Sequence, residues 1–221
     1  MCGRFAFYSP AEATAALFGV DDVPEAKPRY NIAPTQDIAA IRIGSDDSRE
    51  FASLRWGLVP FWAKDPSIGN RMINARAETV AEKPSFRTAY RKRRCLILAD
   101  GFYEWRMESD VKVPYFISLA SGEPFAFAGL WEDWHAKDSD QSMQSTAIIT
   151  TAANEFMGQL HHRMPVVLER KAADSWLGGD DLPEIMDKSP VFQAWPVDRR
   201  VNNARNEGEE LVEPTGETMT A

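Results

Sequence analysis

The stretch CLILADGFYEWR, residues 95–106, contains two strand-like runs joined by the dipeptide Asp100-Gly101. The first run is apolar throughout, which indicates a core strand. The second alternates, so that Phe102 and Glu104 share one face and Tyr103 and Trp105 share the other. Asp-Gly is typical of a turn, and we expect one between the two strands. A strand–turn–strand unit in the middle of the chain predicts a β-rich fold.

Further strand-like runs lie on both sides of this unit and have turn residues between them. They are RFAF (4–7), DIAAIRI (37–43), REFASLRW (49–56), VPYFISL (113–119), FAFAGLW (125–131), STAIITTA (145–152) and FQAWPV (192–197). A succession of short strands joined by turns predicts a largely antiparallel, barrel-like β core. The expected fold class is α+β, a single domain over residues 1–214, with a flexible tail over 215–221.

Short helices are expected around this core. Ser9 and Glu12 form an S-x-x-E capping pattern with Pro10 at the first helical position, and Gly19 suits the helix end. Other helices are predicted over 85–94, 153–160 and 169–178. The segment from Trp56 to Thr79 is aromatic, basic and broken by Pro and Gly, so we expect a long functional surface loop that ends in a helix near 75–82.

Composition limits the functional classes. The chain has 221 residues and a formal net charge of −8, which argues against general polyanion binding by long-range attraction but allows a local basic groove. Its two cysteines, Cys2 and Cys95, are too few for a disulfide framework. It has no N-terminal apolar h-region and no long apolar run, so we expect a cytoplasmic protein without a membrane span.

Cys2 would become the first residue if Met1 were removed. A free α-amine titrates at about 7.7–8.0 and a thiol at about 8.5, so both groups are partly reactive at neutral pH. Together they can attack one aldehyde twice, first through an imine and then by closing a five-membered thiazolidine. The thiol could instead attack an amide alone, and a buried, unreactive cysteine is the structural alternative.

Two further groups could transfer protons. Glu104 lies among aromatic residues, and desolvation there would raise its pKa towards the range useful for acid–base catalysis; the alternative is a surface Glu paired with an Arg. His161 and His162 lie between a helix and a strand, where we expect one to be active and the other structural. No zinc-type spacing of His or Cys occurs, so we expect no metal and no cofactor.

Residues suited to nucleic acid follow the long loop. Asn74 and Arg76 are two apart, so in extended backbone both could face one ligand, whereas in a helix Asn74 would be an N-cap. Trp62 lies among Arg and Lys residues, as in single-strand surfaces where bases stack on aromatic rings. The run Arg91–Arg94 is more simply a solvated helix face.

Taken together, these stretches resemble the SOS response-associated peptidase (SRAP) family from residue 1 to about Pro214. The motifs, in order, are MCGRF (1–5), RYNIAPTQ (29–36), WGLVPFW (56–62), INARAET (73–79), DGFYEW (100–105), HHRMPVVL (161–168) and VNNARNEGEELVEP (201–214). The resemblance implies a β-rich α/β domain that senses abasic sites in single-stranded DNA. It also implies a covalent, reversible thiazolidine crosslink through Cys2, formed by lyase-like Schiff-base chemistry after Met1 is lost.

The matching motifs imply roles for individual residues. Cys2 would be the nucleophile, Asn74 would orient the reacting groups, and Glu104 and His161 would act as acid and base. The implied DNA contacts are phosphate contacts by Arg4, Arg76 and Arg87, base contacts by Pro34 and Trp62, and a pocket contact by Thr150. Other members often carry Asp at position 162, so whether His162 shares the role of His161 stays open. The implied protein is a monomer that associates with the nucleoid when bound to DNA.

Two other functions remain. Glutamine amidohydrolases also begin with MCG, but usually continue with an apolar residue where this chain has Arg4, and they often carry a second domain. A non-covalent single-stranded DNA-binding module is the other alternative. Whether Met1 leaves by self-cleavage or through an aminopeptidase is also open.

Overall fold

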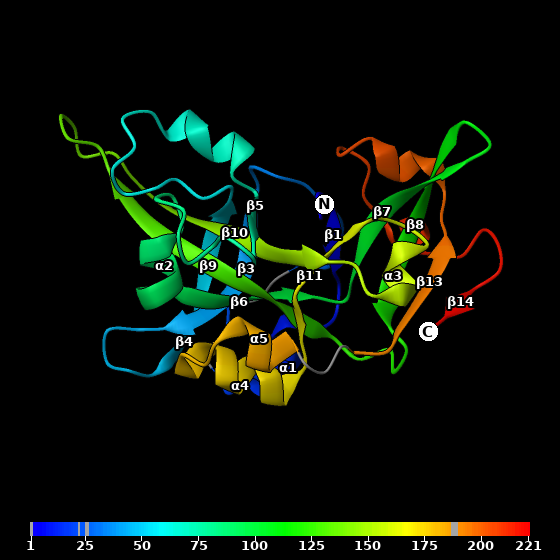
Figure 1. The fold of residues 1–221 in the computed structure, drawn as a ribbon, viewed down its shortest axis with the longest axis horizontal. Coiled ribbons are helices and arrows are strands. Elements are labelled where there is room, and N and C mark those ends of the chain that lie inside the picture. The colour runs from blue at the N-terminus through cyan, green and yellow to red at the C-terminus, as the bar shows by residue number, and fades with distance from the viewer. Residues whose placement is uncertain (1, 22, 25–26, 187–189) are drawn as a thin grey trace.

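The computed structural model describes residues 2–21, 23–24, 27–186 and 190–221 (Figure 1). Its strands form two sheets. The strands are β1 (Phe5–Phe7), β2 (Arg29–Ile32), β3 (Asp37–Ile43), β4 (Arg49–Trp56), β5 (Asn74–Arg76), β6 (Arg94–Ala99), β7 (Gly101–Glu108), β8 (Val111–Leu119), β9 (Phe125–His135), β10 (Ser142–Ala152), β11 (Arg163–Pro165), β12 (Val167–Leu168), β13 (Phe192–Pro196) and β14 (Met219–Thr220).

Five of these strands close a barrel in the order β10-β4-β3-β6-β9, because β10 also pairs with β9. The second sheet has the order β14-β13-β8-β7-β1-β2. Pairing is antiparallel except where β10 meets β4 and β5. The predicted α+β class and the largely antiparallel, barrel-like core are therefore confirmed. One apolar core extends from Cys2 through the barrel to Ala194 in β13.

The helices are short and lie outside the sheets. They are α1 (Ala11–Leu17), α2 (Arg87–Lys92), α3 (Glu155–Gly158), α4 (Arg170–Gly178) and α5 (Leu182–Met186), with 3-10 turns η1 (Pro66–Arg71), η2 (Arg199–Asn202) and η3 (Glu209–Leu211). In Figure 1, α1, α4 and α5 gather at one side of the barrel, and η1 lies on the opposite side. The helices predicted over 85–94, 153–160 and 169–178 are present, though shorter.

Asp100 and Gly101 do not form the hairpin turn that the sequence suggests. The chain passes here from β6 in the barrel to β7 in the other sheet. The Asp100 carboxylate accepts hydrogen bonds from the backbone N–H groups of Tyr8 (2.6 Å) and Ser9 (2.8 Å) and from the Ser9 hydroxyl. Because Ser9 is used in this way, it does not cap α1, whose N-cap residue is Pro10 with no side-chain cap.

The C-terminal segment 215–221 contains a short strand. Met219–Thr220 pairs with Gln193 and Ala194 as strand β14. The Thr215 backbone N–H also donates to Pro196 O at 2.8 Å. These backbone pairings hold both ends of the tail against β13.

Candidate functional site

The N-terminal strand carries Cys2 to the second sheet, next to Glu104. β1 pairs with β7 so that Phe5 lies opposite Phe102, and the Tyr103 N–H donates to Arg4 O at 2.9 Å. This antiparallel register directs Cys2 along the part of β7 that contains Glu104. Cys2 is fully buried, and burial, followed by the negative charge of Glu104, raises the pKa of its thiol. The thiol is therefore protonated at neutral pH.

Asn74 also contacts Cys2, from strand β5, which is attached to the barrel through β10. Its Nδ2 donates to the Cys2 carbonyl at 2.8 Å, although 72 positions separate the two residues. Its Oδ1 is buried and has no hydrogen-bond partner among the described residues. A buried acceptor of this kind favours a donor group, and a free amine on Cys2 would be one.

Strand β5 explains the position of Asn74. It pairs in parallel with β10, with Asn74 opposite Ile148 and Arg76 opposite Thr150. The predicted helix near 75–82 is therefore wrong, because β10 takes up the backbone groups that a helix would use; Ala77 N, for example, donates to Thr150 O at 2.9 Å. In this extended backbone Ala75 is buried, while Asn74 and Arg76 lie on the other face, as the i, i+2 spacing predicts.

Glu104 lines a surface hollow. The hollow has a volume of about 510 Å³ and is lined by Glu104, Trp105, Lys112, His161 and Asn202. The Glu104 side chain is buried, and desolvation raises its pKa, while the nearby His162 acts in the opposite direction. A carboxyl with a raised pKa beside an imidazole is suited to general acid–base chemistry. Phe102 packs in the main core and Tyr103 in a separate cluster, as the alternation predicts.

The two histidines lie together. Their rings stack with centroids 4.2 Å apart. His161 is half-buried, and desolvation lowers its pKa. His162 is exposed, and its pKa is lowered mainly by the charge of His161. Both are therefore neutral near pH 7 and able to accept a proton.

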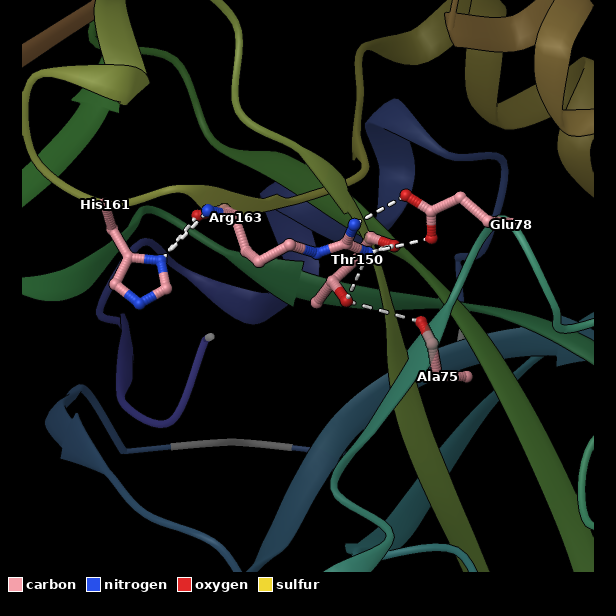
Figure 2. A network of polar contacts seen from close by, with 5 residues as sticks. All are labelled: Ala75, Glu78, Thr150, His161 and Arg163. Carbon is pink, nitrogen blue, oxygen red and sulfur yellow. Dashed lines mark hydrogen bonds and ion pairs between the residues drawn. The ribbon is translucent and has the colours of Figure 1, made fainter.

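The His161 ring is held by the backbone of Arg163 (Figure 2). The Arg163 N–H donates to Nδ1 at 3.0 Å, and the Arg163 carbonyl lies 3.1 Å from the same nitrogen. In the neutral ring, an Nδ1 that accepts a hydrogen bond leaves the proton on Nε2. The contact to the Arg163 carbonyl fits the other tautomer, which has the proton on Nδ1 and leaves Nε2 free to accept one.

Arg76, Trp62 and Arg87 are available to solvent. Arg76 is exposed at the end of β5, beside Asn74. Trp62 is 44% exposed, and its indole N–H lies 3.4 Å from Pro84 O. Pro84 stands three residues before Arg87, which begins α2. This contact brings the aromatic loop and the basic start of α2 together.

The remaining three residues implied to contact DNA are more restricted. Arg4 Nη1 donates to Asn31 Oδ1 at 2.6 Å and to Val201 O at 2.7 Å, and the side chain is half-buried. Thr150 is fully buried, with its hydroxyl 3.5 Å from Ala75 O, so it supports β5 and does not face solvent. Pro34 is half-buried in the turn that follows β2.

Sequence reasoning missed two supporting residues. Asn31 is fully buried, and its amide donates to the carbonyls of Asn203 (3.0 Å) and Asn206 (2.9 Å) while it accepts from Arg4. Asn31 thus ties the 201–206 segment to the strand pair that carries Cys2. Arg163 is the other, and it contacts Glu78, Thr150 and His161. Both residues stand inside quoted motifs, but nothing in the spacing reveals their partners.

Within residues 2–21, 23–24, 27–186 and 190–221, no group of three or more His, Cys, Asp or Glu side chains could hold a metal ion. In that same part of the chain, no helix is both long and apolar enough to cross a membrane.

The sequence model of one family, SOS response associated peptidase (SRAP), matches residues 1–204. The chain belongs to the SRAP family. Among SRAP relatives, the abasic site processing protein YoaM of Bacillus subtilis is 42% identical over 224 residues, which cover 96% of this chain and 98% of YoaM. The abasic site processing protein YedK of Escherichia coli is 33% identical over 228 residues, covering 97% of this chain and 100% of YedK.

Solved structures show the same architecture. A crystal structure of a protein from Bacteroides thetaiotaomicron aligns with a TM-score of 0.84 at 26% identity, covering 97% of this chain and 100% of that chain. A second, from Bordetella bronchiseptica, aligns with a TM-score of 0.76 at 26% identity and covers 89% of this chain and 100% of that chain. The SRAP fold is therefore shared over almost the whole length.

Proposed function

We propose that this protein processes abasic sites in single-stranded DNA by bonding covalently to them through Cys2 after Met1 is removed. The observation that carries the proposal is the convergence on Cys2: Asn74 donates to its carbonyl at 2.8 Å, and the pairing of β1 with β7 brings it to the strand that contains Glu104. The relatives YoaM and YedK are named abasic site processing proteins, which supports the same lesion here.

The chemistry begins with hydrolysis of the Met1–Cys2 peptide bond, which consumes water and releases methionine. This step is the self-processing that the family name suggests. The new α-amine adds to the C1′ aldehyde of the ring-opened sugar, and loss of water gives an imine. The S–H bond then adds across C=N, sulfur to carbon and hydrogen to nitrogen, which closes the thiazolidine.

The neighbouring groups would move the protons in this sequence. A protonated Glu104, favoured by its raised pKa, would donate to the sugar ring oxygen as the ring opens. His161, neutral at pH 7, would accept a proton from the attacking amine in the tautomer that carries its own proton on Nδ1, beside the Arg163 carbonyl, because Nε2 then has the free lone pair. Reversal uses the same groups in the opposite direction, so the link would be reversible. A closed thiazolidine has no free aldehyde, which would protect the strand from β-elimination.

Local positive charge would bind the DNA in spite of the net charge of −8. Arg76 and Arg87 are exposed and suited to phosphates, and Trp62 offers a face for base stacking. Arg4 would contact DNA only through the guanidinium atoms that Asn31 and Val201 leave available. Thr150 is buried and would act on the DNA site only indirectly, because its hydroxyl supports Ala75 in β5.

The deciding experiment is denaturing electrophoresis with a single-stranded abasic oligonucleotide. Wild type should give a slow, denaturant-resistant band, and Cys2→Ser should give none, because a hydroxyl does not replace the thiol in ring closure. Mass spectrometry of the adduct should show loss of Met1 and of one water. A band of equal intensity from both proteins, or from neither, would contradict the proposal.

Controls separate the two other functions considered from the sequence. A non-covalent binding module predicts that Cys2→Ser shifts the oligonucleotide in native gels as well as wild type does, with no denaturant-resistant band from either. A glutamine amidohydrolase predicts ammonia release from glutamine that depends on Cys2. Ammonia release without an abasic adduct would replace the proposed function.

A further inference from the structure

Glu78 and Arg163 form a paired contact beside the site (Figure 2). Arg163 Nη1 donates to Glu78 Oε1 at 2.5 Å, and Arg163 Nη2 donates to Glu78 Oε2 at 3.0 Å. The same Nη2 donates to Thr150 O at 2.7 Å. A guanidinium that binds a carboxylate through two parallel hydrogen bonds is held in direction as well as in distance.

This pair spans one strand of the barrel. At Thr150, β10 pairs with β5 on one side, opposite Arg76, and with β11 on the other, opposite Pro165. Glu78 lies in the turn after β5, and Arg163 begins β11. Both outer strands have only three residues and so form few ladder hydrogen bonds. The Glu78–Arg163 pair therefore adds a direct side-chain link between two strands that otherwise meet only through β10.

Arg163 depends on Glu78 for this geometry. The Arg163 side chain is 14% exposed and that of Glu78 is 48% exposed. Arg163 Nε is buried and has no hydrogen-bond partner among the described residues, so the guanidinium is bound through Nη1 and Nη2, to Glu78 and Thr150. If the Glu78 charge is removed, a nearly buried cation loses its counterion and must turn towards another partner.

The backbone of Arg163 also holds His161, through the contacts of its N–H and carbonyl to Nδ1. Arg163 thus joins Glu78, in the turn that follows the strand of Asn74, to the imidazole on the other side of β10. We infer that Glu78 is a positioning residue, which fixes Arg163 across Thr150 and thereby sets His161 relative to Asn74 and Cys2. The inference rests on the proposed function for its catalytic consequence, but its structural part does not.

The first test is the rate of crosslinking by Glu78→Gln, which keeps the shape and removes the charge. At saturating abasic oligonucleotide we expect the rate constant to fall about tenfold, because small displacements of a catalytic group are costly. Affinity for an oligonucleotide with an unreactive tetrahydrofuran site should stay within about twofold of wild type, since a positioning residue acts on the reaction and not on DNA binding.

A matched control is Asp174→Asn. Asp174 forms a similar surface pair with Arg49 at 2.8 Å, with side chains 54% and 26% exposed, and it lies on α4. It should match Glu78→Gln in thermal stability and crosslink at the wild-type rate. An equal loss of rate in both variants would mean that any broken surface pair slows the reaction, and this would overturn the inference.

The second test needs no DNA. The chain has three histidines, so ¹⁵N ring spectra can be assigned with single His variants. In wild type, Nδ1 of neutral His161 should have the shift of a hydrogen-bond acceptor, with the proton on Nε2. In Glu78→Gln it should move towards the value of a solvent-exposed imidazole, whereas Asp174→Asn should leave it unchanged.

The proposed function and the positioning inference can be contradicted independently of each other. If wild type forms no adduct, the proposed function fails, and the ring spectra alone decide the positioning inference. Unchanged ring shifts and an unchanged rate in Glu78→Gln would overturn the inference. So would tighter DNA binding with faster crosslinking, because Glu78 would then mask Arg163 from phosphate and not position it.

Discussion

Glu104 shows a conflict between stability and chemistry at a single residue. Its carboxyl is almost fully buried, and desolvation raises its pKa. Folding therefore favours the neutral form, and an ionised Glu104 costs stability. The stability that the neutral carboxyl contributes is fully present below the unfolded-state pKa. It is lost as the pH rises through the folded-state pKa.

Replacement of Glu104 by Gln should therefore stabilise the protein while removing its activity. We expect Glu104→Gln to melt a few degrees above wild type at pH 8, with the difference shrinking towards pH 4, where wild-type Glu104 is neutral. Crosslinking should be lost or strongly slowed, since an amide cannot transfer a proton. Thermal melts across this pH range test the sign, and a variant that is less stable than wild type at pH 8 would contradict the assignment.

For single residues, the sequence predicted which side chains share a face of a strand, because this depends only on local spacing. The alternation in FYEWR correctly separated Phe102, in the main core, from Tyr103 and Trp105, which share another cluster, and the i, i+2 spacing of Asn74 and Arg76 placed both on one face. The partners of Arg163 were not predictable, because its contacts to Glu78 and Thr150 join positions 85 and 13 residues away. Such pairs are created by the fold and leave no periodic signal.

Among the elements, strand β5 shows most clearly where local propensity fails. The segment after Met72 resembles a capped helix, yet β10 supplies backbone partners along Asn74–Arg76 and the chain extends. The Asp100-Gly101 step is similar: its composition suggests a hairpin, but the chain moves between sheets there. In both cases a non-local strand overrides the local preference.

Gly101 is required at that step by packing. A Cβ at this position would lie 2.2 Å from Phe116 Cζ and 2.7 Å from the Ile117 carbonyl oxygen. Gly101→Ala should therefore destabilise the protein by about 1–3 kcal/mol or more, as overpacked cores do. It should also disturb β7 at Glu104 and slow crosslinking. Gly158→Ala is the control, because a Cβ there meets nothing within 4 Å; equal denaturation midpoints for the two variants would contradict this packing argument.

Over the whole molecule, the site lies where the two sheets meet. The second sheet contributes Cys2 through the strand β1 and Glu104 through β7, and the barrel contributes Asn74 through its attached strand β5. His161 precedes β11, which pairs with β10. One core joins the two sheets, so these groups are held by the same packed interior. The barrel-like class was predictable from strand runs, but the closure between β9 and β10 was not.

The charge of the whole molecule makes DNA binding a local property. With a net charge of −8, any attraction must come from a few exposed cations such as Arg76 and Arg87, and it should depend steeply on salt. Each phosphate contact to a single strand contributes about 0.7 to the slope of log K against log salt concentration. We expect Arg76→Gln and Arg87→Gln each to reduce that slope by about this amount.

Binding isotherms with an unreactive single-stranded oligonucleotide at several salt concentrations measure these slopes. Arg170→Gln is the control, because this substitution removes the same charge at a distant place. Arg170 is exposed on α4, at the side of the barrel away from η1 (Figure 1). Long-range effects of net charge would weaken binding equally in all three variants. Loss of a direct phosphate contact lowers the slope only in the variant whose arginine made that contact. If Arg170→Gln lowers the slope as much as Arg76→Gln does, the DNA path across β5 and α2 is wrong.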